Sequence, residues 1–180
     1  MGRNRGETGP VRDWTVAGGL IESAEGLLLV CNRRRNGSFD WSPPGGVIEV
    51  ADGESLLDGL TREVEEETGI TVQTWAGPVY EVRAEAVDLG WRLRAEVHVA
   101  VEYQGELRVD DPDGIVVDAR FFELDQCADQ LVHCHPWVRE PLAEWLGAHW
   151  SHLDAPPPYG YRVDGSDIAS LVVTRVDQQR

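Results

Sequence analysis

The stretch "GESLLDGLTREVEEETGI", residues 53–70, combines apolar residues at helical spacing with a dense run of acids. The apolar side chains recur along one helix face, at Leu56, Leu57, Leu60 and Val64. Ser55 is a favoured N-cap residue, and Gly69 is of the type that commonly follows a helix end. The pattern therefore predicts an amphipathic helix over residues 55–68, with its apolar stripe packed on a core.

The acids of this helix gather on one face. Glu63, Glu66 and Glu67 are three and four residues apart, so their carboxylates lie together beside the apolar stripe. Like charges at this spacing destabilise a helix by about 0.2–0.5 kcal/mol per pair. A solvated acidic surface is the common interpretation of such a run. A second interpretation is a cation site, because Mg²⁺ and Mn²⁺ bind carboxylate oxygens and keep positions open for water and phosphate oxygens.

The spacing of the acids continues upstream into a longer motif. With U for a bulky aliphatic residue, the pattern E-x7-R-E-U-x-E-E-x-G-U is matched at Glu54, Arg62, Glu63, Val64, Glu66, Glu67, Gly69 and Ile70. This stretch resembles the Nudix box, whose full form starts with a glycine six residues before the first glutamate. Ile48 stands there instead, and Gly46 lies eight residues before Glu54, so this loop is two residues longer. The resemblance extends over roughly residues 14–146 and is weaker outside the box.

The resemblance implies the Nudix fold, an α/β domain in which a mixed β-sheet is sandwiched between helices. It also implies a hydrolase that uses Mg²⁺ or Mn²⁺ to direct water onto a phosphorus atom of a nucleoside diphosphate linked to another group. ADP-ribose, nucleotide sugars, dinucleoside polyphosphates and nucleoside triphosphates belong to this substrate class. The clustered acids alone indicate the same phosphoryl chemistry, but they do not identify the nucleoside.

The resemblance further implies roles for single residues of the box. Glu66 and Glu67 would be the main metal ligands, and Glu63 would be a further ligand or a weak base. The resemblance also implies that the carbonyl oxygen of Gly46 is a metal ligand. Arg62 would orient Glu63 through a salt bridge. The two extra residues between Gly46 and Glu54 affect the position of the Gly46 carbonyl relative to the box.

The general base and the substrate contacts stay open at this stage. Four acids downstream of the box are candidates for the base, although "DDPDG" at 110–114 is also typical of a turn: Asp111, Asp113, Asp118 and Glu123. The arginine triplet at 33–35 either contacts phosphate or is a solvated loop. Tryptophans such as Trp41 and Trp91 either stack on a base or pack in the core. Our candidate substrate-binding residues are Arg33, Trp41, Glu54 and Asp118, with Glu54 alternatively structural or an outer-shell ligand.

Charge and composition restrict the classes of molecule that this chain can bind and the compartment in which it is expected. A formal charge of −16 in 180 residues repels nucleic acid polymers and anionic membranes, so a small phosphorylated substrate needs a bridging cation or a local basic patch. The start of the chain lacks the apolar core of a signal peptide, and the apolar runs are too short to span a bilayer, which predicts a cytoplasmic protein. Cys31, Cys127 and Cys134 lack zinc or disulfide spacing, although "HCH" at 133–135 leaves a zinc site as an alternative.

The remaining sequence predicts a mostly β domain. Alternating runs predict a hairpin of strands at 15–21 and 27–33, and further strands at 72–86, 91–103 and 118–124. A second helix is expected within 136–150. We predict a domain over 1–150 and, over 151–180, a Pro-rich connector and a tail hairpin that packs on the domain or on a second subunit. A homodimer is one expectation from this tail.

Other functional classes remain possible within the same fold, because a fold alone does not fix a function. A non-catalytic nucleotide sensor would show eroded carboxylates, whereas the acids of the box are present. An isoprenoid diphosphate isomerase would need a catalytic Cys paired with a Glu, and no such pairing is evident. The sequence thus favours hydrolysis of a phosphoanhydride bond.

Overall fold

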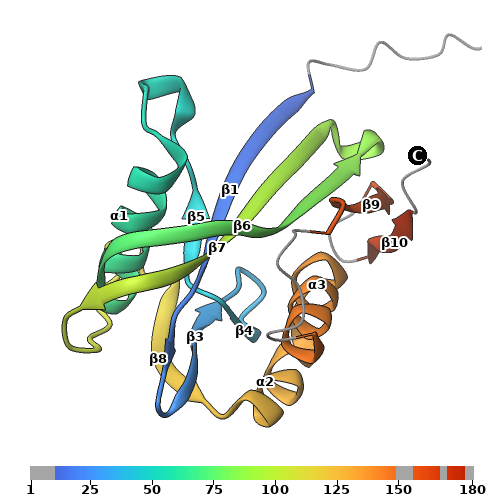
Figure 1. The fold of residues 1–180 in the computed structure, drawn as a ribbon. Helices are drawn as coiled ribbons and strands as arrows, with labels where there is room; N and C mark the ends of the chain where they lie inside the picture. The colour runs from blue at the N-terminus through green and yellow to red at the C-terminus, as the bar shows by residue number, and fades with distance from the viewer. Residues whose placement is uncertain (1–10, 149–155, 167–169, 177–180) are drawn as a thin grey trace, which may run out of the picture.

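The computed structural model describes residues 11–148, 156–166 and 170–176. Two β-sheets lie between helices (Figure 1). The strands of the first sheet are β1 (Arg12–Leu20), β5 (Gly45–Val47), β6 (Thr71–Ala86), β7 (Trp91–Gln104), β9 (Tyr159–Asp164) and β10 (Val172–Val176). Their order across the sheet is β10-β9-β6-β7-β1-β5. The β1–β7 and β6–β9 pairs are parallel and the other pairs are antiparallel, so the sheet is mixed as predicted.

The second sheet is antiparallel and centres on one buried strand. Its strands are β2 (Glu22–Ser23), β3 (Gly26–Arg33), β4 (Phe39–Ser42) and β8 (Val116–Phe122). Three α-helices and three short 3-10 helices complete the described chain: α1 (Leu56–Thr68), α2 (Leu124–Gln130), α3 (Pro136–Gly147), η1 (Val50–Asp52), η2 (Val87–Leu89) and η3 (Leu131–His133). None of the described helices is long and apolar enough to cross a membrane.

Helix α1 confirms the helix predicted over 55–68. The Ser55 hydroxyl accepts a hydrogen bond from the Asp58 backbone N–H at 3.2 Å, and Gly69 ends the helix in the left-handed conformation with φ of 73°. The indole N–H of Trp75 on β6 donates to the Thr61 hydroxyl at 2.9 Å. The N-cap and the hydrogen bond from Trp75 fix the rotation of α1 about its axis. They therefore fix the direction in which its acidic side chains point.

Apolar residues form a core on each side of the sheets. The core under α1 includes Ala17, Ile21, Leu28, Val30, Ile48, Leu60 and Val64. The core under α2 and α3 includes Leu20, Leu27, Leu29, Val82, Cys127, Leu142 and Tyr161. Figure 1 shows α1 on one side of the strands and α2 and α3 on the other. The sandwich of helices around a mixed sheet is therefore confirmed.

The predicted hairpin of strands 15–21 and 27–33 is confirmed only around its turn, where β2 pairs with β3 and the Leu28 N–H donates to the Ile21 carbonyl at 2.9 Å. The pairing of the two full strands is wrong. β1 pairs with β7 and β5, whereas β3 pairs with β2, β4 and β8 in the other sheet. β1 packs against α1, and the ring of Trp75 reaches it from β6: a Cβ on Gly19 would lie 2.7 Å from that ring and 3.3 Å from Val64 of α1. A short alternating run predicts a strand and its buried face, but it carries no information about the partner.

The C-terminal strands extend the first sheet. β9 and β10 form the antiparallel pair expected of the tail, and β9 adds to β6 in parallel register. Tyr161 and Val163 of β9 are both buried, and Tyr161 belongs to the core under α2 and α3. Residues 151–155 of the expected connector, and the boundary expected at 150, lie outside the described residues.

Candidate active site

Arg62 organises the acids of α1. Its Nε and Nη2 atoms contact the two Glu54 carboxylate oxygens at 2.9 and 3.2 Å. Its Nη1 atom donates to Glu63 at 2.8 Å and to Glu66 at 3.1 Å. The hydrogen bond from Arg62 is the main cause that lowers the pKa of Glu54, and the carboxylates in turn raise the pKa of Arg62. One guanidinium thus holds three carboxylates in fixed positions.

Glu67 is the most buried acid of this group, with 9% of its surface exposed. Its Oε2 atom accepts a hydrogen bond from the Gly45 backbone N–H of β5 at 2.8 Å. Burial raises the pKa of Glu67 to about 8; the Gly45 N–H opposes this rise, and the charges of Glu63, Asp111 and Glu66 add to it. A carboxylate held this way, among other acids, is strongly stabilised by any nearby positive charge.

The Gly45–Gly46 pair brings β5 into direct contact with α1. A Cβ on Gly46 would lie 2.4 Å from Glu63 Oε2, so only glycine fits without moving that carboxylate. Burial is also the largest cause that raises the pKa of Glu63, with Arg62 opposing the rise. The sequence "PPGG" signals a turn but not this close approach.

The long loop between Gly46 and Glu54 contains one turn of 3-10 helix, η1, which ends at Gly53 with φ of 86°. The backbone N–H of Glu49 donates to Glu54 Oε2 at 3.1 Å across this turn. Glu54 still reaches Arg62, and Gly46 still lies against Glu63. The contacts at both ends of the loop are made despite its length.

A loop before β8 places further acids near the box. Asp111 accepts hydrogen bonds from the backbone N–H groups of Asp113, Ile115 and Val116 at 3.1, 2.7 and 2.8 Å. Asp111 therefore shapes the turn, which the sequence "DDPDG" allowed. The charge of Asp113 contributes to the raised pKa of Glu63. The loop and the box share one electrostatic environment.

Arg33 anchors the same loop from β3. Its Nη2 atom donates to the Gly114 carbonyl at 3.1 Å, and its backbone N–H donates to the Ile115 carbonyl at 2.8 Å. The neighbouring Arg34 is engaged elsewhere, in a two-pronged contact with the buried carboxylate of Asp40 at 2.5 and 2.7 Å. Asp40 is a partner that the sequence pattern did not single out.

The other candidate residues contact partners outside the Nudix box. Asp118 pairs with Cys31 in the strand register and contacts Arg120 at 2.5 Å. Trp41 packs edge-on against Phe122, with ring centroids 4.9 Å apart, in the core under α3. Glu123 stands at the start of α2. The structure does not group these three candidates with the acids of α1.

A family model for the NUDIX domain matches residues 12–146. The chain belongs to the Nudix family. It is accordingly an enzyme of the Nudix pyrophosphohydrolase class. The sequence has no match among curated proteins.

Several solved structures share the Nudix fold with this chain. A MutT NUDIX hydrolase from Burkholderia pseudomallei is 26% identical, with a TM-score of 0.60, over 73% of this chain and 97% of that one. The E. coli ORF135 protein is 19% identical, with a TM-score of 0.63, over 82% and 100% of the two chains. An ADP-ribose pyrophosphatase from Streptococcus suis is 22% identical, with a TM-score of 0.51, over 81% and 97%. These likenesses confirm the Nudix fold.

The Nudix box offers the donor type that Mg²⁺ prefers, namely carboxylate oxygen. In the described part of the chain, no group of three or more His, Cys, Asp or Glu side chains is arranged so that it could hold a metal ion. Glu63 and Glu66 each direct one oxygen to Arg62 instead. The fit to a cation therefore rests on the burial of Glu67 beside other acids.

Proposed function

We propose that this Nudix protein hydrolyses a phosphoanhydride bond in a nucleoside diphosphate linked to another group, with Mg²⁺ or Mn²⁺ as cofactor. The substrate is a small molecule of the ADP-ribose, nucleotide-sugar, dinucleoside-polyphosphate or nucleoside-triphosphate class. The observation that carries this proposal is the buried Glu67 carboxylate, which is held by the Gly45 N–H among other acids. A buried carboxylate whose pKa is raised further by neighbouring negative charges favours a bound divalent cation.

In this proposal the cation is held by Glu63, Glu66, Glu67 and the Gly46 carbonyl. A bound cation would offset the charge that develops on phosphate oxygens and would make water a better nucleophile. The chain's own contribution is to position the ligands before substrate arrives. The Gly45 N–H fixes Glu67, and Arg62 fixes Glu63 and Glu66.

For the general base, the loop before β8 supports Asp113. The carboxylate of Asp111 accepts three backbone hydrogen bonds and is committed to the turn. Asp113 is exposed on that turn, and its charge acts on Glu63. We assign Asp113 the role of accepting the proton from the attacking water, and Asp111 the role of holding the loop.

For substrate contacts, the arrangement favours Arg33 over the other candidates. Arg33 is exposed and borders the acidic loop, where a guanidinium can meet a phosphate. Glu54 forms an ion pair with Arg62, and Asp118 forms one with Arg120. Trp41 packs against the core. We therefore propose structural roles for these three residues.

A substrate panel tests the proposed function. The purified chain is incubated with ADP-ribose, a nucleotide sugar, a dinucleoside polyphosphate, coenzyme A and an oxidised nucleoside triphosphate, each with Mg²⁺ or with EDTA, and products are separated by chromatography. We expect at least one compound to be cleaved only with the metal. Saturable binding of nucleotides without cleavage would refute hydrolysis and would indicate the sensor instead.

The homodimer and the cytoplasmic location stay predictions. The β10 strand lies at the edge of the first sheet, where Val172 is largely exposed, and an edge strand of this kind can pair with a second copy. Light scattering measures the mass directly: twice the 20.0 kDa of one chain supports the dimer, and a single chain mass refutes it.

A further inference from the structure

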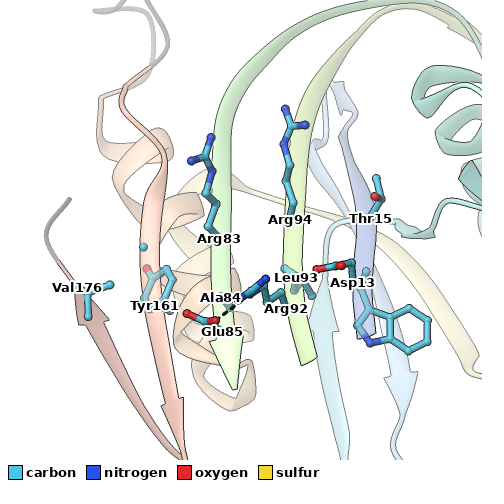
Figure 2. Close-up of a pocket in the computed structure, with 12 residues that line it drawn as sticks. Asp13, Thr15, Arg83, Ala84, Glu85, Arg92, Leu93, Arg94, Tyr161 and Val176 are labelled. Atoms are coloured by element: carbon cyan, nitrogen blue, oxygen red, sulfur yellow. Dashed lines mark hydrogen bonds and ion pairs between the residues drawn. The ribbon is translucent and has the colours of Figure 1, made fainter. Parts of the chain in front are cut away.

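The first sheet carries an open cavity whose lining residues lie outside the Nudix box. Its volume is about 530 Å³, and its walls come from β1, β6, β7, β9 and β10 (Figure 2). No residue of the 45–70 segment lines it. Gly160, Tyr161 and Val176 form one wall, and these residues lie beyond the 12–146 segment that the family model matches. The C-terminal strands, which extend past the family domain, thus complete this cavity.

Two arginines of the cavity face each other across adjacent strands. Arg83 of β6 and Arg94 of β7 are direct partners in the antiparallel register. Their side chains are 56% and 57% exposed, and Figure 2 shows both extending from the same side of the sheet. Like charges directly opposite in a sheet are destabilising, by roughly 0.2–1 kcal/mol. The neighbouring cross-strand pair, Glu81 and Glu96, offsets part of this cost, and a bound anion would offset the remainder.

The contacts of these arginines leave most of each guanidinium open. Arg83 and Arg94 approach one oxygen of Glu81 at 3.8 and 3.6 Å, and Arg94 also contacts Glu96 at 2.7 Å. All of these contacts use the Nη2 atom. Among the described residues, no other nitrogen of either guanidinium has a hydrogen bond or an ion pair. Donors of both residues are therefore available at the same point of the surface.

Two exposed arginines elsewhere on the protein serve as a comparison, because neither lines the cavity. Arg120 contacts Asp118 at 2.5 Å, and Arg162 donates through Nε to Asp164 at 2.9 Å. Their side chains are 64% and 60% exposed, close to the values of Arg83 and Arg94. Neither is paired with another arginine in the strand registers. Arg92 lines the cavity itself and is therefore unsuitable as a control.

We propose that Arg83 and Arg94 together bind the phosphate group of a small molecule, either inorganic phosphate or a phosphomonoester. Guanidinium groups match phosphate oxygens in geometry, and two of them on neighbouring strands present several donors to one tetrahedral anion. A chain of charge −16 repels anions from most of its surface. Asp13 and Glu85 also line this cavity, but Arg83, Arg92 and Arg94 outnumber them, so an anion is favoured there. The cavity has the size of small-molecule sites in proteins and leaves room for more than the phosphate itself. The proposal is independent of the hydrolytic function.

Calorimetric titration tests this site. Inorganic phosphate is titrated into the full chain in EDTA at constant ionic strength, and ribose 5-phosphate is titrated in a second arm. We expect saturable binding of one phosphate per chain, weakened by about tenfold or more in the Arg83→Gln/Arg94→Gln variant. The control variant Arg120→Gln/Arg162→Gln removes the same charge from residues that do not line the cavity and is expected to change the affinity by less than about threefold. Tighter binding of ribose 5-phosphate identifies a phosphomonoester, and equal or weaker binding identifies inorganic phosphate.

Two outcomes of the titration would overturn the proposal. Absence of saturable binding in both arms, or equal weakening in the two double variants, would show that the arginines only contribute to the general field. Circular dichroism checks that the variants fold. If Arg83→Gln/Arg94→Gln does not fold, Arg94→Lys decides, because lysine keeps the charge but lacks the planar fork. Unchanged phosphate affinity in Arg94→Lys would then refute the site.

Discussion

Replacing Glu67 by Gln should change how the stability of the metal-free protein depends on pH. Glu67 is nearly buried, and its Oε2 atom accepts the Gly45 N–H at 2.8 Å. Burial and the neighbouring acids raise the pKa of this carboxyl from 4.5 to about 8. Gln has the same shape and keeps an oxygen for the Gly45 N–H, but it carries no charge at any pH. The substitution therefore isolates the cost of ionising Glu67.

The sign follows from the direction of the pKa shift. A carboxyl whose pKa is raised on folding contributes stability below its unfolded pKa and loses that contribution as the pH rises through the folded pKa. For Glu67 this window runs from pH 4.5 to about 8. At about 1.4 kcal/mol per pH unit, the full window corresponds to at most about 5 kcal/mol, and relaxation around the buried charge reduces the expected value to about 2–4 kcal/mol.

Urea unfolding in EDTA between pH 5 and pH 9 measures this effect. We expect the Glu67→Gln variant and the wild type to have similar free energies of unfolding at pH 5, and the variant to be more stable by about 2–4 kcal/mol above pH 8. Glu65→Gln is the matched control, because Glu65 is exposed on the same helix. A difference between Glu67→Gln and the wild type that stays constant over this pH range would refute the burial argument.

Three further predictions follow from single contacts. Gly46→Ala places a Cβ 2.4 Å from Glu63 Oε2, so we expect kcat to fall by about tenfold or more in a steady-state assay; an unchanged kcat would mean that this carboxylate need not stay in place. Trp75→Phe removes the indole hydrogen bond to Thr61 and should cost about 1 kcal/mol in urea unfolding, so equal stability would contradict its role in seating α1. Asp111→Ala removes the acceptor of three backbone amides, so their hydrogen exchange should quicken by about tenfold; unaltered exchange would show that the turn holds without it.

The sequence predicted α1 and its acids because local signals agree there. The apolar stripe, the Ser55 cap and the Gly69 stop all lie within one short segment, and the structure places the helix within one residue of the prediction. The spacing of Glu63, Glu66 and Glu67 also fixes their common face without knowledge of any other element. Local periodicity is sufficient for such features.

The features that the sequence did not predict depend on contacts between distant segments. The pairing of β1 with β7 joins residues some eighty positions apart, and alternation in either strand does not encode it. The amide of Gly45 reaches Glu67 only because β5 lies against α1. The ion pair between Arg34 and Asp40 likewise depends on the pairing of β3 with β4. Long-range packing decides each of these contacts.

The most direct test of the central claim is the metal-dependent activity of Glu67→Gln on whichever panel compound the wild type cleaves. We expect the wild type and Glu65→Gln to hydrolyse it with Mg²⁺ and not with EDTA, and we expect Glu67→Gln to fold but to lose activity by about a hundredfold or more. A folded Glu67→Gln variant that keeps wild-type, Mg²⁺-dependent turnover would contradict the claim that this buried carboxylate holds the cation.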